Sequence, residues 1–167
     1  MTVIVGWEGS AADAPHFAAI QDEILRAALS EISIVVHTIG YEGDASDPLW
    51  RLGERWRIDP PGSAATARDF DVQLVPLARP PLNGRVLTGR VTTAMRARIP
   101  VIATERWPLR ALIVDGVTGV LIPANRPREW NRAILRLAGD AVLREAMGEA
   151  AANRAASMRR TRGRGRP

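Results

Sequence analysis

The sequence predicts an α/β fold in which helices flank a doubly wound, Rossmann-like parallel sheet. Short apolar runs rich in β-branched residues recur along the chain, and amphipathic segments of helical length separate them. Gly and Pro stand at the junctions between these segments, where they favour turns. Strands connected through helices run parallel, because a crossover returns the chain to the same edge of the sheet. At 167 residues, the chain is long enough for one such domain with its own core.

The first half of the chain supplies two strands and a helix, followed by a looser stretch. The strands are Thr2–Val5 and Ile32–Gly40, and the second of these is strongly β-branched. Pro15 favours the first turn of a helix, and apolar residues at three-to-four spacing continue that helix to near residue 30. The looser stretch that follows predicts a short helix around Trp50–Gly53 and a weak strand over "RWRI".

The second half continues the alternation of strands and helices. The Pro pair in "ARPPLNG", Ala78–Gly84, excludes regular structure there, because proline lacks an amide hydrogen and fixes φ. We assign residues 1–156 to one Rossmann-like domain and residues 157–167 to a disordered, Arg-rich tail. The expected elements are the strand Asp71–Leu77, the helix Val86–Ala97, the strand Val101–Ala103, a helical turn or two over Leu109–Val114, the strand Val120–Ile122, and two closing helices from Pro127 to near Ala156.

The charge and the residue types argue against several functional classes. The net charge is +5, and five arginines between Arg159 and Arg166 account for all of it, so the folded body is near neutral. We therefore expect no nucleic-acid-binding face on the body, and only the tail offers charge for phosphate contacts with RNA or an anionic membrane. The chain has no Cys, and His16 and His37 lie far apart, so no metal site is expected. The N-terminus does not read as a signal peptide and no apolar run has membrane-spanning length, so we expect a cytoplasmic protein.

Three loops are the places to look for a ligand. Parallel α/β sheets bind ligands beyond the carboxyl ends of their strands, where the strand order reverses, and this rule points to residues 6–15, 78–89 and 104–110. In the first loop, Gly9 permits close approach of a backbone and Ser10 offers an N–H to an anion. Both residues are also typical of the simple start of a helix.

The second loop leads into a predicted helix whose start carries several polar residues. A helix N-terminus bears partial positive charge and unpaired N–H groups, which attract an anion. Two guanidiniums and a hydroxyl beside it would bind a diphosphate. Alternatively, Arg85 and Arg90 both point into solvent. The residues alone do not decide between diphosphate binding and simple exposure to solvent. The two histidines are interpreted as structural. The polar residues at the helix start are Asn83, Gly84, Arg85, Thr88 and Arg90.

The segment "AMRARIPVIATERWPLRALIVDGVTGVLIP" resembles the donor-binding half of group 1 glycosyltransferases, which have the GT-B fold. That family shows an "EAMAxGxPVVAT" helix and strand, then a short helix and a "DGxTGxLV" turn and strand. Here Ala94–Met95, Ile99–Thr104 and Asp115–Ile122 match these motifs. Leu143–Ala151, "LREAMGEAA", is similar to the closing "LRxxLGxxA" helix of the family. The resemblance covers roughly Val3–Ala155.

The resemblance implies a nucleotide-sugar site built from the loops of this domain. The family's glutamate that holds the nucleotide ribose falls on Thr93, so that contact is missing or remade by a hydroxyl. The partner glutamate of the family's two-glutamate motif falls near Arg85. A basic position of some branches falls on Arg90, and Arg98 stands at the usual glycine. The loop after the first strand lacks the usual Arg and Lys pair for the diphosphate. We expect loss of nucleotide binding on Arg90→Ala and no metal or further cofactor. The expected donor-binding residues are Gly9, Ser10, Asn83, Gly84, Arg85, Thr88, Arg90 and Thr93.

GT-B enzymes act in the cleft between two Rossmann-like domains, and the acceptor side belongs to the N-terminal one. The resemblance begins at the second domain. We therefore expect part of a glycosyltransferase, of the retaining hexosyltransferase type, that needs an N-terminal acceptor-binding domain or subunit. No catalytic residue can be named from the sequence. The alternative is a degenerate, non-catalytic domain that serves as an interaction module, which the replaced glutamates favour. A weaker third reading is binding to RNA or a membrane through the Arg tail.

Overall fold

A parallel sheet forms the centre of the molecule. The computed structural model describes residues 1–41, 43–80 and 83–163. Within these residues, six strands pair in the order β3-β2-β1-β4-β5-β6, and every pairing is parallel. This architecture confirms the predicted doubly wound α/β class. The strands are β1 (Val3–Glu8), β2 (Ile34–Ile39), β3 (Trp56–Asp59), β4 (Val72–Val75), β5 (Val101–Thr104) and β6 (Val120–Ile122).

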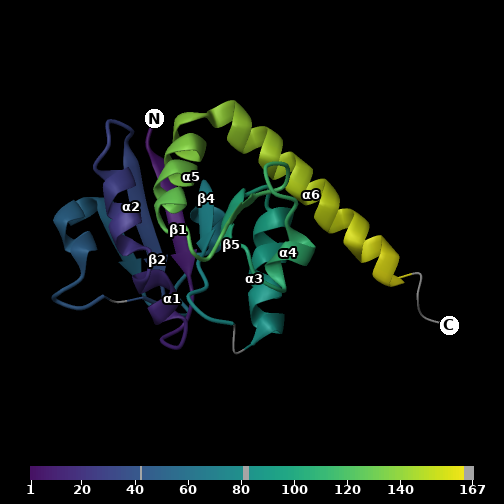
Figure 1. Ribbon diagram of the computed structural model, residues 1–167, viewed down its shortest axis with the longest axis horizontal. Helices are drawn as coiled ribbons and strands as arrows, with labels where there is room; N and C mark the ends of the chain where they lie inside the picture. Colours follow the sequence, from purple (N-terminus) through teal and green to yellow (C-terminus); the bar gives the residue numbers. More distant parts are fainter. Residues whose placement is uncertain (42, 81–82, 164–167) are drawn as a thin grey trace.

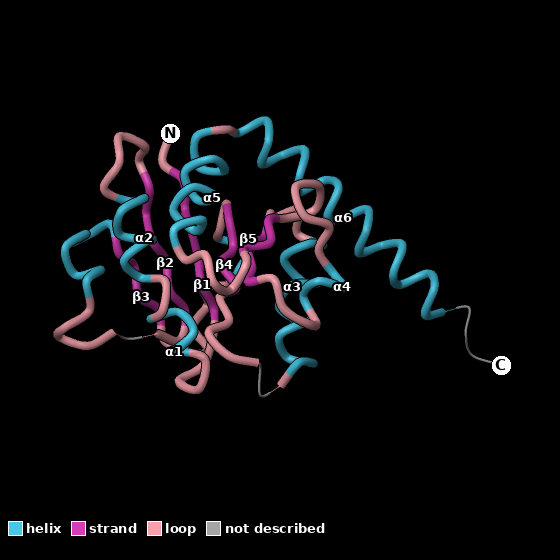
Figure 2. Tube along the Cα trace, in the orientation of Figure 1, coloured by secondary structure: helices cyan, strands magenta, loops and turns pink. Residues whose placement is uncertain are grey.

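Helices cover both faces of the sheet (Figure 1). α2 (Gln21–Ala28) and α5 (Arg128–Gly139) pack side by side over one face, and α3 (Gly84–Arg96) and α6 (Ala141–Gly163) pack together over the other. Figure 2 shows the strands as a central layer between these helices. The short helices are α1 (Ala14–Ala18), α4 (Leu109–Leu112) and the 3₁₀ segments η1 (Pro48–Arg55) and η2 (Ala67–Asp69).

The two faces of the sheet feed two separate apolar cores. Successive side chains of a strand point to opposite faces, so β2 sends Val36 into the core under α2 and α5 and Ile39 into the core under α3 and α6. All six residues of β2 are buried, as its β-branched run predicts for a strand covered on both sides. β1 lies at the centre, because Val5 pairs with Val36 on one side and with Val72 on the other.

Two helix boundaries differ from the prediction. The helix expected from Pro15 to near residue 30 is two helices, because Ile20 leaves the helical region with φ −120° and ψ 4°. The closing helix does not end near Ala156 but continues to Gly163, so residues 157–163 are helical and are not the start of a disordered tail. Arginine is a good helix former, and it extends a helix that packing has already nucleated. Residues 164–167 lie outside the described residues.

The looser stretch has the elements that its sequence predicts. η1 includes the short helix expected around residue 50, and the weak strand "RWRI" contributes β3 at the edge of the sheet. The sequence did not predict a carboxylate beside His37. In the structure, Asp59 at the end of β3 lies there, and its Oδ2 is 2.7 Å from His37 Nε2. None of the helices described is both long and apolar enough to cross a bilayer.

Candidate functional site

The three loops predicted to carry a ligand site leave the same edge of the sheet. They follow β1, β4 and β5, which are neighbours in the parallel sheet, so their carboxyl ends lie together. The strand order reverses between β1 and β4, since the chain builds outward from β1 to β3 and then returns to begin β4 on the other side. This position is the switch point at which doubly wound sheets bind their ligands.

The first loop binds a carboxylate of the chain itself. Asp13 Oδ2 accepts three hydrogen bonds, from the backbone N–H of Ser10 at 2.9 Å, from Ser10 Oγ at 2.8 Å and from Arg90 Nη1 at 2.9 Å. Burial acts to raise the pKa of Asp13, but the hydrogen bonds from Arg90 and Ser10 prevail and hold that pKa below its ordinary value of 3.8. Ser10 and Arg90, both predicted to contact a diphosphate, are thus already bonded to an internal anion.

Gly9 has a structural reason to be glycine. A Cβ there would lie 2.2 Å from the ring of Trp7, and the Gly9 carbonyl packs so close to Gly40 that a Cβ on Gly40 would lie 2.1 Å from it. The backbone N–H of Gly9 donates to the carbonyl of Ile39 at 3.0 Å. The group that approaches Gly9 closely is therefore the protein's own chain, at Trp7 and Gly40.

The predicted residues of α3 divide between two faces of that helix. Residues three apart lie on one face, so Arg85 and Thr88 form one set and Arg90 and Thr93 form another. Arg90 faces the switch point and bonds Asp13, while Thr93, one turn further on, is exposed. Asn83 caps the helix, since its Oδ1 accepts from Val86 N at 3.2 Å.

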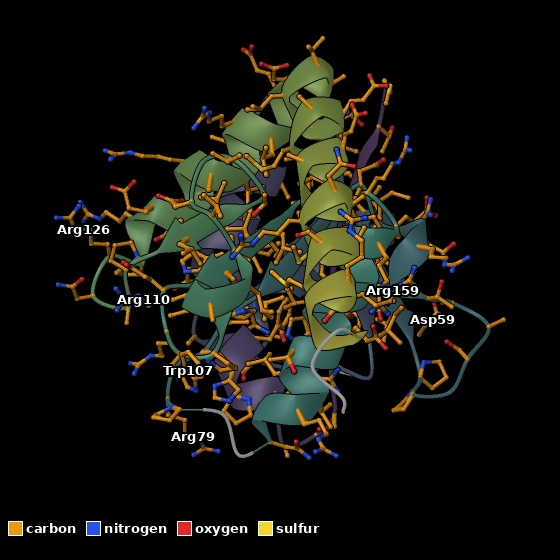
Figure 3. All side chains as sticks on the ribbon, turned by 90° about the vertical axis from the view of Figure 1, so that its right-hand side faces the viewer. Asp59, Arg79, Trp107, Arg110, Arg126 and Arg159 are labelled. Atoms are coloured by element: carbon orange, nitrogen blue, oxygen red, sulfur yellow. The ribbon has the colours of Figure 1, made fainter. Side chains whose placement is uncertain are left out.

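Arg85 and Thr88 lie beside a large surface cavity. The cavity measures about 1290 Å³ and lies between the start of α3 and the segment that joins β5 to α4. Within this lining there are three arginines and no carboxylate, so the cavity attracts anions. Figure 3 shows two of its side chains, Trp107 and Arg110, on the same flank of the molecule. The lining residues are Pro80, Gly84, Arg85, Thr88, Arg106, Trp107, Pro108, Arg110 and Ala111.

The segment between β5 and α4 supplies residues that the sequence reasoning did not single out. Trp107 is 75% exposed, which is unusual for so large an apolar ring. Arg106 places its Nε in a buried position, where no group of the described residues accepts its hydrogen bond. Arg110 lies 3.7 Å from Glu105, and both side chains are exposed. The signal that points to them is an Arg-Trp-Pro run directly after a strand whose carboxyl end lies at the binding edge.

Two buried side chains hold the start of the Pro-rich loop that reaches this cavity. Thr104 Oγ1 accepts from the backbone N–H of Leu77 at 2.8 Å, and His16 Nδ1 accepts from that of Ala78 at 3.1 Å. Burial, assisted by the positive charge of Arg79, lowers the pKa of His16 below its ordinary value of 6.5. The neutral ring that results is the form that can accept this bond, in keeping with a structural role for His16.

A second, much smaller cavity lies at the switch point. It measures about 20 Å³, enough for about one water molecule but not for a sugar or a phosphate. Glu8, Asp13, His16 and Arg90 contribute polar groups to its wall. Among the described residues, no group of three or more His, Asp or Glu is arranged to hold a metal ion.

The family of glycosyl transferases group 1 matches residues 90–154, which run from α3 into α6. The chain has the fold of a group 1 glycosyltransferase domain. No curated protein matches the sequence.

Solved structures have the same fold as this chain. TarM from S. aureus superposes with a TM-score of 0.73 at 18% identity, over 92% of this chain and 32% of its own. HepE from Anabaena gives 0.72 at 17% identity, over 93% of this chain and 44% of its own. The C-terminal domain of LpcC from Francisella tularensis gives 0.70 at 17% identity, over 93% and 85%. The chain thus spans about a third of TarM and less than half of HepE.

One departure from the group 1 motifs falls at a left-handed backbone position. Arg98 stands where the family usually has glycine, and its φ is 61°, in the left-handed region that glycine adopts without strain. The carbonyl of Arg98 lies against Gly148 of the closing "LREAMGEAA" helix, where a Cβ would approach it to 2.0 Å. Two of the matched motifs thus meet at this contact.

Proposed function

We propose that this chain is the nucleotide-sugar-binding part of a glycosyltransferase and that the donor's diphosphate binds in the cavity at the start of α3. One observation carries the proposal: Arg85, Arg106 and Arg110 converge on a cavity with no carboxylate in its lining. The first turn of α3 has no acidic residue, so its partial positive charge adds to theirs. The comparisons support the ligand class, because HepE was crystallised with UDP-glucose and TarM with UDP.

Each group in the cavity has a role in this proposal. The guanidiniums of Arg85 and Arg106 bind phosphate oxygens, and charge-assisted bonds of this kind are roughly twice as strong as neutral ones. The buried Nε of Arg106 gains the acceptor that it lacks within the described residues. The exposed ring of Trp107 offers an apolar face to the base or the sugar. Because arginines supply the positive charge, we propose that no metal ion is needed.

The acceptor side is proposed to come from another domain or subunit. The chain spans about a third of TarM and less than half of HepE. We propose that the complete enzyme transfers a hexosyl group with retention, as the resemblance to group 1 enzymes implies, and that the catalytic groups outside this chain complete the site.

A nucleotide titration tests the proposal. A ligand that binds only the folded protein raises its free energy of unfolding by about 2.7 kcal/mol at a hundred times Kd, which a thermal melt detects. We expect UDP, GDP or one of their sugars to raise the Tm, and Arg106→Ala to weaken binding about 10- to 100-fold. Arg132→Ala is the control, since Arg132 is 75% exposed on α5. If neither nucleotides nor their sugars move the Tm at millimolar concentration, the chain does not bind donors and the proposal fails.

A non-catalytic interaction module remains the second candidate, and one observation favours it. Ser10 and Arg90 are bonded to Asp13, and Thr93 presents an exposed hydroxyl where the family has the ribose glutamate. A module of this kind folds normally, shows no response to any nucleotide, and binds a protein that carries the acceptor domain. The same titration separates the two candidates, because only the donor-binding domain changes its Tm.

A further inference from the structure

The contact between Asp13 and Arg90 lies at the switch point of the sheet. All three hydrogen bonds of this contact converge on one carboxylate oxygen, Asp13 Oδ2. The donors are a backbone N–H, a hydroxyl and a guanidinium, which are the groups that proteins commonly use to hold a phosphate oxygen. Arg90 comes from a helix 77 positions further along the chain, so this is a tertiary contact in addition to a local turn.

The cavity beside this contact is too small for a second anion. The adjoining cavity measures about 20 Å³, and Glu8 lies in its wall with a further carboxylate. The side chain of Arg90 is 22% exposed and that of Asp13 is 35% exposed, so the pair is partly shielded from solvent. Hydrogen bonds from Arg90 and Ser10 hold the pKa of Asp13 below 3.8 despite its burial, so the carboxylate is ionised at neutral pH.

We infer that Asp13 is a specificity-determining residue that occupies an anion site at Ser10 and Arg90 and thereby directs the donor's diphosphate to the cavity of Arg85, Arg106 and Arg110. The part about the route of the diphosphate rests on the proposed function. The part about Asp13, that it holds an anion site closed, concerns the switch point alone and does not. Removal of the carboxylate leaves Arg90 and Ser10 without their internal acceptor, and an external phosphate oxygen takes that place.

The test is a double-mutant cycle with inorganic pyrophosphate and UDP as probes. Wild type, Asp13→Ala, Arg90→Ala and the double variant are titrated by calorimetry at low salt. We expect Asp13→Ala to bind pyrophosphate at least about tenfold more tightly than wild type, which corresponds to one charge-assisted hydrogen bond gained. The sequence predicts loss of nucleotide binding on Arg90→Ala, but because Arg90 is bonded to Asp13 we expect this variant alone to change the affinity of wild type less than about twofold. In the Asp13→Ala background, Arg90→Ala removes the gain.

Two matched variants keep the test specific. Glu129→Ala removes one carboxylate from another Arg pair of the same 2.9 Å length, on α5, and raises the net charge equally. We expect it to leave pyrophosphate binding unchanged. Asp13→Asn keeps the shape of the side chain and removes the charge, so it supplies the same comparison if the alanine variant does not fold.

The outcomes separate this inference from the proposed function. If Asp13→Ala and Asp13→Asn gain no affinity, or if Arg90→Ala weakens wild type about tenfold or more, Asp13 does not hold a site closed and the inference is overturned. If wild type binds neither probe while Asp13→Ala binds pyrophosphate through Arg90, the closed site is real but the proposed donor function of wild type fails. If wild type binds UDP and loses it on Arg106→Ala but not on Arg90→Ala, and Asp13→Ala gains pyrophosphate affinity through Arg90, both stand.

Discussion

The contact between α6 and the carbonyl of Arg98 makes a quantitative prediction for Gly148→Ala. Gly148 is buried inside α6, and an added Cβ would lie 2.0 Å from Arg98 O and 2.8 Å from Arg98 C. Ordinary carbon contacts lie at about 3.5–4.0 Å, so α6 and the turn before β5 must separate by more than about 1 Å. The obstacle is backbone and cannot rotate aside as a side chain would.

The expected cost follows from overpacking against a rigid group. Added methyl groups in packed interiors cost about 1–3 kcal/mol, and a backbone obstacle places this variant at the upper end. Alanine's better helix propensity returns about 1 kcal/mol, so we expect a net loss of about 2 kcal/mol. For a domain of this size, that loss lowers the Tm by about 4–8 °C. Urea unfolding followed by circular dichroism measures the free energy directly, and the slope with urea should stay unchanged.

Gly89→Ala is the matched control for this substitution. Gly89 is also a helical glycine, but it is exposed on α3 and nothing lies within 4 Å of an added Cβ. We expect it to stabilise the fold by about 0.5–1 kcal/mol through helix propensity alone. Opposite signs for the two variants are the expected result. A Gly148→Ala protein as stable as wild type, with the gain at Gly89 present, would show that α6 does not lie against Arg98 and would refute the packing argument.

Two further variants test local strain and pH dependence. Arg98→Gly should stabilise the fold by about 1 kcal/mol in urea unfolding, because it relieves a left-handed φ of 61°, whereas Arg96→Gly in the last turn of α3 should destabilise it by a similar amount. The pKa of His16 is lowered in the folded state, so its contribution to stability is complete above pH 6.5 and is lost as the pH falls through the folded pKa. Urea unfolding at pH 8, 6.5 and 5 should therefore show wild type losing stability relative to His16→Gln on acidification, and parallel pH profiles for the two proteins would contradict the bond from Ala78 to a neutral ring.

The sheet was predictable because its signals are local. β-branched runs mark β2 and β4, and proline and glycine mark the loops, so each strand could be placed from its own residues. The break between α1 and α2 was not predictable from the sequence, because no Gly or Pro stands near Ile20 to indicate it. The length of α6 was missed because a Gly-containing, Arg-rich segment suggests disorder, while packing of α6 on α3 supplies the nucleus from which the helix extends.

The sequence predicts which loops form the site, but not how their side chains are arranged. The rule for doubly wound sheets selects the correct edge, and the arginines of α3 follow from the sequence. Which face of α3 each arginine occupies depends on how that helix rests on the sheet. The ion pair of Asp13 with Arg90 joins residues 77 positions apart, and the cavity forms only where α4 and the segment before it bring Arg110 and Arg106 beside the start of α3. Long-range geometry of this kind has no local signal.

We propose that the pattern of charge replacements reflects a displaced site and not a decayed one. The group 1 motifs carry basic residues in the loop after the first strand and a glutamate at the position of Arg85. In this chain the signs are exchanged: Asp13 lies in that loop, and Arg85 begins α3 beside Arg106 and Arg110. Random loss of function removes each charge independently of the others. Here, by contrast, the carboxylate of Asp13 neutralises Arg90 at the switch point. The other three cations line one cavity whose lining has no carboxylate. An anion is repelled from one position and attracted to the other. Of the three cations, Arg110 lies 3.7 Å from Glu105, whereas Arg85 and Arg106 form no ion pair within the described residues. Positive charge of this kind is stable only where an anion binds or solvent screens it. The salt dependence of UDP binding therefore decides the matter: affinity through the cavity must fall steeply with ionic strength and must depend on Arg85 and Arg106, whereas a decayed site shows no affinity to lose.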